Sequence, residues 1–247
     1  MKISNIEKEF RRIKSLGFIK SKRSHNTGIG KTFEDYLGVN ENNIKDPDFE
    51  GFEVKSQRYL TSSKITLFTK SPTYPQNANY YIKDKYGVFD TTCNKIKKIH
   101  TSFFGDRENT YLRKYSFKLN IDRKKKKIFF IIKDLLNKKI LNSNIHYTFN
   151  DIIDSTKKLD KLFVVTADTK VKRGKEYFHF KNATLFIGFN FDKFLNLIEQ
   201  GKIQYDIRIG AYRSGQNKCK PHDHGSGFRI DRDSIKALYK TVIELDW

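Results

Sequence analysis

Runs of β-branched and aromatic residues alternate with amphipathic segments along the chain, and this alternation limits the folds open to it. Four runs have the composition of β-strands: FEVKSQ at 52–57, KITLFTKS at 64–71, KLFVVTAD at 161–168 and KEYFHFKNATLF at 175–186. Helical spacing of apolar residues recurs at 1–17, 149–159 and 191–201. Because strands and helices are intermixed, we predict an α/β (α+β) fold with a mixed central sheet flanked by helices.

The segments between these elements carry turn and helix signals. Residues 32–37 are predicted to form a short helix that Gly38 ends, and residues 233–242 the last helix. The stretch 41–51 has the composition of a turn, and the basic run at 123–127 marks a hairpin tip before a strand at 127–134. Prolines, asparagines and lysines indicate loops through much of 72–126.

The chain carries a large excess of positive charge. Its 247 residues include 49 Lys and Arg against 28 Asp and Glu, a formal net charge of +21. A folded protein tolerates such self-repulsion mainly when it binds a polyanion, so the charge favours nucleic acid as the partner. A solvated lysine surface from an AT-rich genome is the alternative interpretation. Aromatic residues make up 14% of the chain, which is too many for a disordered protein.

Cysteine usage and the N-terminus indicate the compartment. Two cysteines, Cys93 and Cys219, give no disulfide framework, which suits a reducing cytoplasm. The N-terminal segment is an amphipathic helix without the apolar core of a signal peptide, and no apolar run is long enough to span a bilayer. We therefore expect a soluble, cytoplasmic protein that does not bind a membrane.

The stretch TGIGKT at 27–32 has the outline of a phosphate-binding P-loop but lacks its first glycine. Gly30, Lys31 and Thr32 complete the pattern G-x-x-x-x-G-K-[ST], whereas its first position is His25. The preceding residues are polar and basic, unlike the strand that leads into a P-loop. We predict instead that the stretch leads into the following helix, with its backbone amides and Lys31 available for a phosphate.

The stretch PDFEGFEVKS at 47–56 combines two carboxylates and a lysine in the spacing D-x₄-E-x-K. Residues two apart in a strand point to one face, so Glu53 and Lys55 are expected to project together, with their neighbours facing a core. Asp48, at the start of the strand, can fold back beside Glu53. Two adjacent carboxylates repel unless a divalent cation lies between them, and such an oxygen site suits Mg²⁺. An ordinary solvent-facing Glu–Lys pair is the alternative.

These residues together are typical of metal-dependent phosphodiester hydrolysis. The charge of Lys55 would orient the metal-bound water, lower its pKa and offset charge on the scissile phosphate. Glu34, in the short helix, is positioned to approach the same site. We predict Asp48, Glu53, Lys55 and Glu34 as catalytic residues, with Asp48 and Glu53 as the ligands of Mg²⁺.

Several separated motifs resemble the MvaI/BcnI family of Type II restriction endonucleases. They are TGIGKTFEDYLGVNENN, PDFEGFEVKSQR, ITLFTKSPTYP, and DIRIGAYRSG followed by HDHGSGFRI. The match is collinear over 25–80 and 160–231 and is loosest through 85–145. By this match, Asp48, Glu53 and Lys55 take the catalytic positions, and Glu34 is the matching acid on the helix.

The resemblance implies a MutH-like version of the restriction-endonuclease-like PD-(D/E)xK fold, with two lobes around a DNA cleft. We expect a catalytic lobe over 1–145 and a DNA-recognition lobe over 146–247. The resemblance also implies Mg²⁺-dependent cleavage of double-stranded DNA at a short CCNGG-type site (CCWGG or CCSGG), within a prokaryotic restriction-modification system. Family enzymes act as monomers that nick each strand in turn. A cognate DNA methyltransferase belongs to the system but need not be a physical partner.

The C-terminal run RIGAYRSGQNKCKPHDHGSGFRI is rich in side chains that read base edges. Arg pairs with guanine N7 and O6, and Asp accepts from cytosine N4. The resemblance places the family's recognition loop here, and Asp206 and Arg208 are expected to share one face of the preceding strand. The predicted DNA-binding residues are Lys31, Lys70, Asp206, Arg208, Tyr212, Arg213, His222, Asp223, His224 and Arg229.

Other interpretations of this run are open. Cys219, His222 and His224 form a partial zinc pattern that lacks a fourth ligand and the usual spacing. A polar surface loop with incidental histidines is the second alternative. The remaining histidines, His25, His100, His146 and His179, are expected to be structural or surface residues.

Two alternatives concern the whole chain. One is a MutH-like strand-specific nicking endonuclease that serves DNA repair, and the other is a catalytically silent DNA-binding module. The presence of Asp48, Glu53 and Lys55 together argues against the silent module, because a protein that only binds DNA gains nothing from acids that face phosphate.

Overall fold

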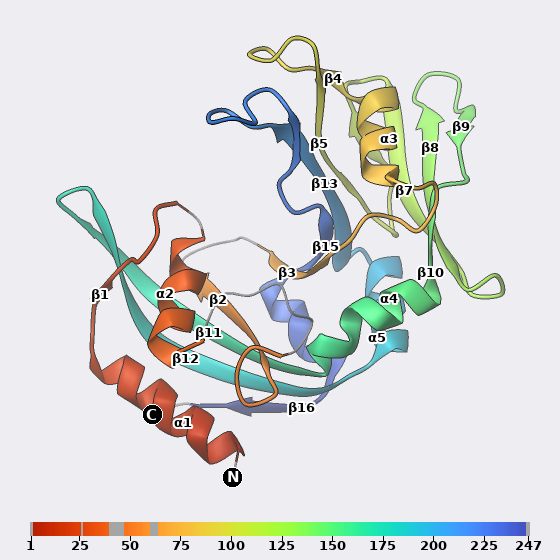
Figure 1. Cartoon of the computed structure of the whole chain (residues 1–247). Helices are drawn as coiled ribbons and strands as arrows, with labels where there is room; N and C mark the ends of the chain where they lie inside the picture. The colour runs from red at the N-terminus through yellow and green to blue at the C-terminus, as the bar shows by residue number, and fades with distance from the viewer. Residues whose placement is uncertain (1, 26, 40–46, 60–63, 246–247) are drawn as a thin grey trace. The chain divides into compact units, whose positions relative to one another are not determined.

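The chain folds into two compact units, each assembled from separate segments of the sequence (Figure 1). The structure, a computed structural model, describes residues 2–25, 27–39, 47–59 and 64–245. Unit 1 comprises Met1–Ile65, Lys157–Asn190 and Ile235–Trp247, and unit 2 comprises Thr66–Thr156 and Phe191–Ser234. These units are a different partition of the chain from the expected lobes at 1–145 and 146–247, whose separate roles stay a prediction.

Unit 1 is a five-stranded mixed sheet with helices packed against it. Its strands follow the order β1-β12-β11-β2. Strand β16 pairs with a later part of β12 than the part that pairs with β1. Strands β2 and β11 run parallel, and the other pairs are antiparallel. The elements are α1 (Lys2–Ser15), β1 (Ile19–Lys20), α2 (Gly28–Leu37), β2 (Glu53–Arg58), the 3₁₀ helix η1 (Lys157–Asp160), β11 (Lys161–Lys172), β12 (Lys175–Phe189) and β16 (Tyr239–Glu244).

One apolar cluster holds the helices of unit 1 to this sheet. Ile6, Phe10 and Ile13 recur at helical spacing on α1 and are fully buried, as that spacing predicts. They pack in the same cluster as Phe33 of α2 and Phe163 of β11. Figure 1 shows α1 and α2 beside this sheet. Helix α2 is thereby fixed close to β2, the strand that carries the predicted catalytic pair.

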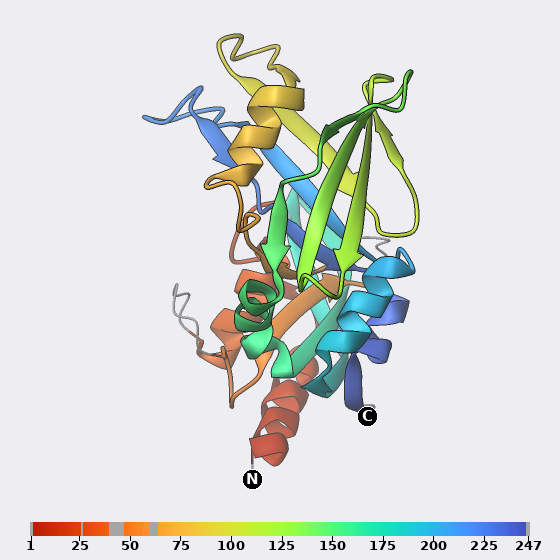
Figure 2. The same cartoon turned by 90° about the vertical axis from the view of Figure 1, so that its right-hand side faces the viewer.

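Unit 2 is built on two sheets with helices beside them. A five-stranded sheet has the order β10-β8-β7-β6 with β9 on β8, and Figure 2 shows its green strands side by side. A six-stranded sheet has the order β3-β15-β13-β5-β4 with β14 on β13. The elements are β3 (Ile65–Thr69), α3 (Ala78–Tyr86), β4 (Val88–Phe89), β5 (Lys97–Phe103), β6 (Asn109–Tyr111), β7 (Tyr115–Asp122), β8 (Lys127–Asp134), β9 (Ile140–Asn142), β10 (His146–Thr148), α4 (Phe149–Thr156), α5 (Phe191–Glu199), β13 (Ile203–Ala211), β14 (Pro221–Asp223), β15 (Gly227–Ile230) and the 3₁₀ helix η2 (Arg232–Leu238), which continues into unit 1.

An aromatic core joins the two sheets of unit 2. Phe103 of β5 stacks on Phe117 of β7 with ring centroids 4.8 Å apart. Tyr205 of β13 meets Phe130 of β8 edge to face at 5.0 Å. Phe228 of β15 lies 5.3 Å from Tyr205, so the packing extends to a third strand of the larger sheet. This core fixes β13, the strand that carries the predicted DNA-reading residues.

Several predictions about individual elements are confirmed. The strands at 52–57 and 64–71 correspond to β2 and β3, and the basic run at 123–127 connects β7 to β8. Gly38 ends α2 in the left-handed conformation, with φ of 75°. Helix α2 begins earlier than predicted, at Gly28, because the glycine-rich stretch forms its first turn. The turn predicted over 41–51 lies partly outside the described residues.

Two predictions about secondary structure are wrong. The stretch 72–126 contains α3 and strands β4 to β7, because its short runs pair with one another, with the adjacent β8 and with the distant β13. The last segment forms η2 and then β16, and only η2 is helical. Pairing with β12, in which Ile243 faces Leu185, supplies backbone hydrogen bonds that outweigh the helical pattern.

The expectation that the two cysteines form no disulfide is also wrong. Cys93 and Cys219 are bonded to each other although 126 residues separate them in sequence. Sequence spacing could not indicate this pairing, because the fold of unit 2 brings the two loops together. None of the helices in the described part of the chain has the length and apolar composition that crossing a membrane requires.

Candidate functional site

Strand β2 places Glu53 and Lys55 on one face, as the alternation of the sequence predicts. Lys55 Nζ forms an ion pair with Glu53 Oε1. Val54, between them, is 3% exposed and belongs to the apolar cluster of unit 1. In the parallel pairing with β11, Glu53 lies beside Leu162 and Lys55 beside Val164. The pair is therefore fixed by the sheet and by the core beneath it.

Asp48 folds back onto this strand. A tight turn between Phe49 and Phe52, whose backbones exchange two hydrogen bonds, reverses the chain just before β2. Gly51 in that turn has φ of 81°, a conformation that favours glycine. The Asp48 Oδ2 atom then accepts a hydrogen bond from the Val54 amide at 2.8 Å. Asp48 is thus held next to Glu53, the placement that the sequence motif predicts.

Lys158 of η1 joins the site from a distant part of the sequence. Its Nζ atom lies 2.9 Å from Glu53 Oε1, the same oxygen that Lys55 contacts. No sequence motif marks this residue, because only the packing of η1 against β11 and β12 brings it to β2. The site therefore contains two carboxylates and two ammonium groups.

The two carboxylates have opposite electrostatic environments. Desolvation raises the pKa of Asp48 above its ordinary value, the hydrogen bond from Val54 opposes this, and the charge of Glu53 adds to it. Burial also acts to raise the pKa of Glu53, but the charges and hydrogen bonds of Lys55 and Lys158 outweigh it and hold that pKa below its usual range. Glu53 is accordingly ionised at neutral pH although it is 2% exposed.

One oxygen of Glu53 is left over. Oε2 is buried and has no hydrogen-bond partner among the residues that the structure describes. A buried carboxylate oxygen without a donor is costly, and a divalent cation would compensate it. Two neighbouring carboxylates provide the hard oxygen ligands that suit Mg²⁺, which retains several waters. The residues present therefore fit the predicted metal, and Asp48 and Glu53 stay its predicted ligands.

The predicted residues of α2 come close to β2 through the packing of that helix. Glu34 is half-buried on α2, which packs against β2, and its part in catalysis stays a prediction. Lys31 was expected to be free for a phosphate, but its Nζ lies 2.7 Å from Asp35 Oδ1 one turn further along α2. A phosphate would have to compete with this pair.

In unit 2, strand β13 holds Asp206 and Arg208 on one face. Arg208 Nη2 donates to Asp206 Oδ2 at 2.9 Å, and the Arg208 side chain is 48% exposed. Asp206 is 4% exposed and also accepts hydrogen bonds from Ser102 and Gln204. Burial acts to raise the pKa of Asp206, but the hydrogen bonds from Ser102 and Gln204 and the charges of Arg208 and Arg229 outweigh it and lower that pKa. The buried Asp206 carboxylate thus orients the exposed guanidinium group of Arg208.

Arg229 is part of the same network and is buried rather than exposed. It is 6% exposed, and its Nε donates to Asp206 Oδ2 at 2.8 Å. Its other nitrogens donate to Thr66 Oγ1 and, at 2.6 Å, to the Gly225 carbonyl. The structure therefore shows Arg229 as a support for Asp206, and base reading by Arg229 stays a prediction.

The predicted histidines form a cluster with an aromatic ring and with a histidine that the sequence did not single out. Tyr212 stacks on His222 at 4.1 Å, and His222 meets His224 at 4.4 Å. His100, expected to be structural or surface, lies 6.2 Å from His224 and is paired with Arg208 across β5 and β13. Burial and then the neighbouring positive groups lower the pKa of His100 and of His224, which keeps both neutral at pH 7.

Arg213 anchors the loop that precedes this cluster. Its guanidinium donates to both carboxylate oxygens of Asp90 at 2.8 Å. This bidentate contact, together with amide donors from Thr92 and Cys93, holds the pKa of Asp90 far below its usual range. The Cys93–Cys219 disulfide ties the same two loops. It also occupies the cysteine of the partial zinc pattern, and the described residues hold no group of three metal-ligating side chains.

Lys70 and Asp223 line a pocket of about 310 Å³ in unit 2. Lys70 Nζ lies 3.0 Å from Asp151 Oδ1, and Asp223 Oδ2 accepts from Asn79 at 3.0 Å. Asp223 Oδ1 accepts from the Ser226 amide at 2.6 Å, which orders the loop between β14 and β15. Asn79 and Tyr80, at the start of α3, complete a polar wall that no sequence motif predicts.

Comparisons with known proteins identify the family and the structures that the chain resembles. The model of the MvaI/BcnI restriction endonuclease family matches residues 7–239. Among solved structures, the complex of restriction endonuclease MvaI with its cognate DNA substrate has a TM-score of 0.91 and 33% identity, covering 98% of this chain and 97% of that chain. MvaI in the absence of DNA has a TM-score of 0.62 and 32% identity, covering 99% and 98%. No curated protein sequence matches the chain.

These likenesses extend over nearly the whole chain and include the segments that carry Asp48, Glu53 and Arg208. The fold is of the PD-(D/E)xK type. The chain therefore belongs to the MvaI/BcnI restriction endonuclease family and is a Type II restriction endonuclease.

Proposed function

We propose that this enzyme hydrolyses phosphodiester bonds in double-stranded DNA at a short CCNGG-type site (CCWGG or CCSGG), with Mg²⁺, as part of a restriction-modification system. The observation that carries the proposal is the cluster of Asp48, Glu53 and Lys55, in which a buried carboxylate oxygen lacks a donor among the described residues. The net charge of +21 supports a polyanionic substrate.

In the proposed mechanism, Asp48 and Glu53 would hold Mg²⁺, which when bound would activate a water molecule and offset charge on the scissile phosphate. Lys55 moves from Glu53 Oε1 to the reacting phosphate, where its ammonium group donates to an oxygen that gains charge. Lys158 remains on Glu53 and keeps that carboxylate ionised. Glu34 is the proposed further acid from α2.

The proposed recognition surface is the exposed side of unit 2. Arg208, oriented by Asp206, would donate to guanine O6 and N7 in the major groove. His222 and His224, in contact with Tyr212, would contact neighbouring base edges. Asp223 is placed near them on β14, where one or both of its oxygens would accept from a cytosine amino group. Unit 1 would then cleave and unit 2 would read the sequence.

We further propose that the enzyme acts as a monomer in a prokaryotic cytoplasm, where incoming DNA is its substrate. A cognate methyltransferase would protect the host sequence without forming a complex with this chain. The compartment rests on the substrate, because the disulfide removes the argument from cysteine usage.

Digestion of a supercoiled plasmid with the full-length enzyme tests the proposed function. The plasmid carries one CCAGG site and one CCGGG site, and the reaction contains Mg²⁺ with an EDTA control. Linear product whose sequenced ends fall within one of these sites supports the proposal. Nicked circle alone would indicate the strand-specific nicking enzyme, and a mobility shift without cleavage would indicate the silent DNA-binding module.

A further inference from the structure

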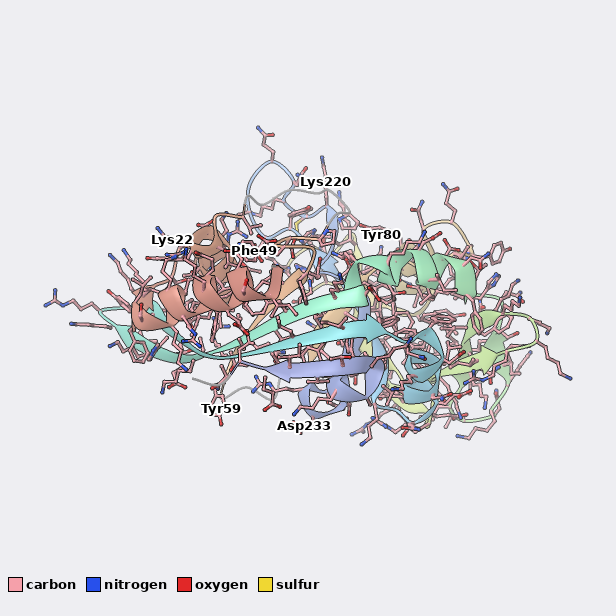
Figure 3. The ribbon with its side chains drawn as sticks, turned by 90° about the horizontal axis from the view of Figure 1, so that it is seen from below. Lys22, Phe49, Tyr59, Tyr80, Lys220 and Asp233 are labelled. Carbon is pink, nitrogen blue, oxygen red and sulfur yellow. A yellow bond between two sulfur atoms is a disulfide. The ribbon has the colours of Figure 1, made fainter. Side chains whose placement is uncertain are left out.

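In the described part of unit 1, the hairpin of β11 and β12 extends beyond the strands that pair with it. Among the described residues, β2 pairs with β11 as far as Ala167, and β1 pairs with β12 at Phe178 and Tyr177. The turn at Arg173 and Gly174 has positive φ at both residues, as a tight two-residue hairpin requires. Figure 3 shows side chains with blue nitrogen ends around this tip.

Four lysines lie on one face of this hairpin and of the adjoining β1, and we name them the lysine face: Lys20, Lys170, Lys172 and Lys175. Lys172 is directly opposite Lys175, and directly opposed residues of antiparallel strands point to the same side. Lys170 and Lys20 flank Tyr177 from β11 and β1, so they share that side. Lys170 Nζ lies 4.0 Å from the ring centroid of Phe18, two residues before Lys20 on the same face.

The charges of the lysine face are not balanced locally. All four side chains belong to exposed residues, and within the described part of the chain none of the four forms a salt bridge. The nearby acids are engaged elsewhere: Glu176 binds Arg58 at 2.8 Å and Asp168 pairs with Lys181. The charge of Lys175 lowers the pKa of Lys20, which shows that the two ammonium groups repel. Like charges placed opposite each other destabilise a hairpin, so stability does not explain the arrangement.

The lysine face is on the same side of the sheet as the catalytic pair. Along β11, Leu162 and Val164 lie beside Glu53 and Lys55, and Lys170 and Lys172 follow at even spacing. The alternate residues, which include Phe163, Val165 and Ala167, face the apolar cluster. A strand rises about 3.3 Å per residue, so Lys170 and Lys172 lie about 20 Å and about 26 Å along β11 from the position beside Lys55.

We propose that the lysine face binds phosphates of duplex DNA that flank the recognition sequence. With a phosphate at Lys55 and a duplex that follows β11, these lysines reach the backbone about 6–8 base pairs away, since phosphates of one strand are about 3.4 Å apart along the axis. The inference rests on the proposed cleavage of duplex DNA. The positive charge of the lysine face, and its place on the face of the sheet that carries Glu53 and Lys55, identify duplex DNA as the occupant.

The test compares two duplexes that contain the cognate site, one with about 3 base pairs and one with about 12 base pairs on each side, lengths set by the reach above. The enzyme variant carries Lys20→Gln, Lys170→Gln, Lys172→Gln and Lys175→Gln. A matched control removes the same charge from exposed lysines of unit 2 through Lys114→Gln, Lys124→Gln, Lys139→Gln and Lys202→Gln. Binding is measured at several salt concentrations without Mg²⁺.

The wild-type enzyme is expected to bind the long duplex with a salt slope about 2–4 units steeper than for the short duplex, at about 0.9 unit per phosphate contact. The lysine-face variant should lose this difference, while the control retains it. Equal slopes for the wild type on both duplexes, or a long-duplex slope unchanged in the variant, would overturn the inference. Cleavage of the short duplex with Mg²⁺ reports separately on the proposed function, because that duplex does not reach the lysine face.

Discussion

Lys158 Nζ lies 2.9 Å from Glu53 Oε1, although the two residues belong to segments far apart in the sequence. The same oxygen contacts Lys55, whereas Oε2 of Glu53 has no partner among the described residues. The carboxylate is therefore neutralised on one side and available on the other. This asymmetry is what a metal ligand next to a catalytic lysine requires.

Glu53→Gln and Asp48→Ala are each expected to abolish cleavage while DNA binding stays measurable. Each change removes one proposed metal ligand with its negative charge and leaves the proposed recognition residues of unit 2 intact. Binding should become equal or tighter, because a negative charge that faces phosphate is lost. Single-turnover cleavage and gel-shift assays measure the two effects, with Glu176→Gln as a control in the same unit. Full Mg²⁺-dependent activity of Asp48→Ala would end the assignment of this motif.

Lys55→Ala should lower the single-turnover rate by on the order of 10²-fold or more, because a positioned charge at the reacting phosphate is lost. Affinity for DNA should change little. Lys158→Ala should cost less, about tenfold, because Lys158 contacts Glu53 and does not itself donate to the reacting phosphate in the proposed mechanism. A normal rate with weakened binding for Lys55→Ala would show that this residue clamps the backbone instead.

Arg208→Ala should relax discrimination at one base pair by about 1–3 kcal/mol and leave affinity for random DNA nearly constant. Lys31→Ala, if this side chain touches a phosphate, should weaken binding to all sequences alike and reduce the salt slope by about one unit. Binding to the cognate site and to single-base variants at two salt concentrations separates the two classes. An equal loss on every sequence for Arg208→Ala would place recognition elsewhere.

Arg229→Ala should destabilise the protein by about 3–5 kcal/mol, because it leaves Asp206 buried with one partner fewer. Urea unfolding measures this, and Arg208→Ala, at an exposed side chain, should cost far less. If Arg229→Ala instead leaves stability unchanged and lowers affinity only at one base pair, the residue reads that base directly.

Stability should depend on pH through His100 and His224. Their pKa values are lowered in the folded state, so the unfolded chain binds more protons at mildly acidic pH. The free energy of unfolding should therefore fall as the pH falls through about 6.5 and level off below the folded pKa values. The variant His100→Gln/His224→Gln should show a smaller slope in this window, and His25→Asn should not. Identical slopes for the double variant and the wild type would mean that other groups cause the pH dependence.

The local geometry of β2 and of the turn before it follows from the residues of that segment alone. Alternation in FEVKSQ put Glu53 and Lys55 on one side and Val54 in the core, and the glycine before them allowed the turn that returns Asp48. Such features follow from the two-residue period of a strand and from steric limits on φ, which act between neighbours. The charge of the chain likewise pointed to a polyanion without any knowledge of the fold.

Which distant groups meet depends instead on the packing of the whole chain. Four contacts join segments that carry no common motif: Lys158 with Glu53, Arg229 with Asp206, His100 with His224, and the disulfide between Cys93 and Cys219. Strand β16 exists because β12 offers it hydrogen bonds, although its sequence had indicated a helix. Long-range strand pairing and the burial of apolar side chains outweigh local helix or strand propensity, because each involves several contacts at once. The pattern of neighbouring residues does not indicate which distant segment a strand will pair with.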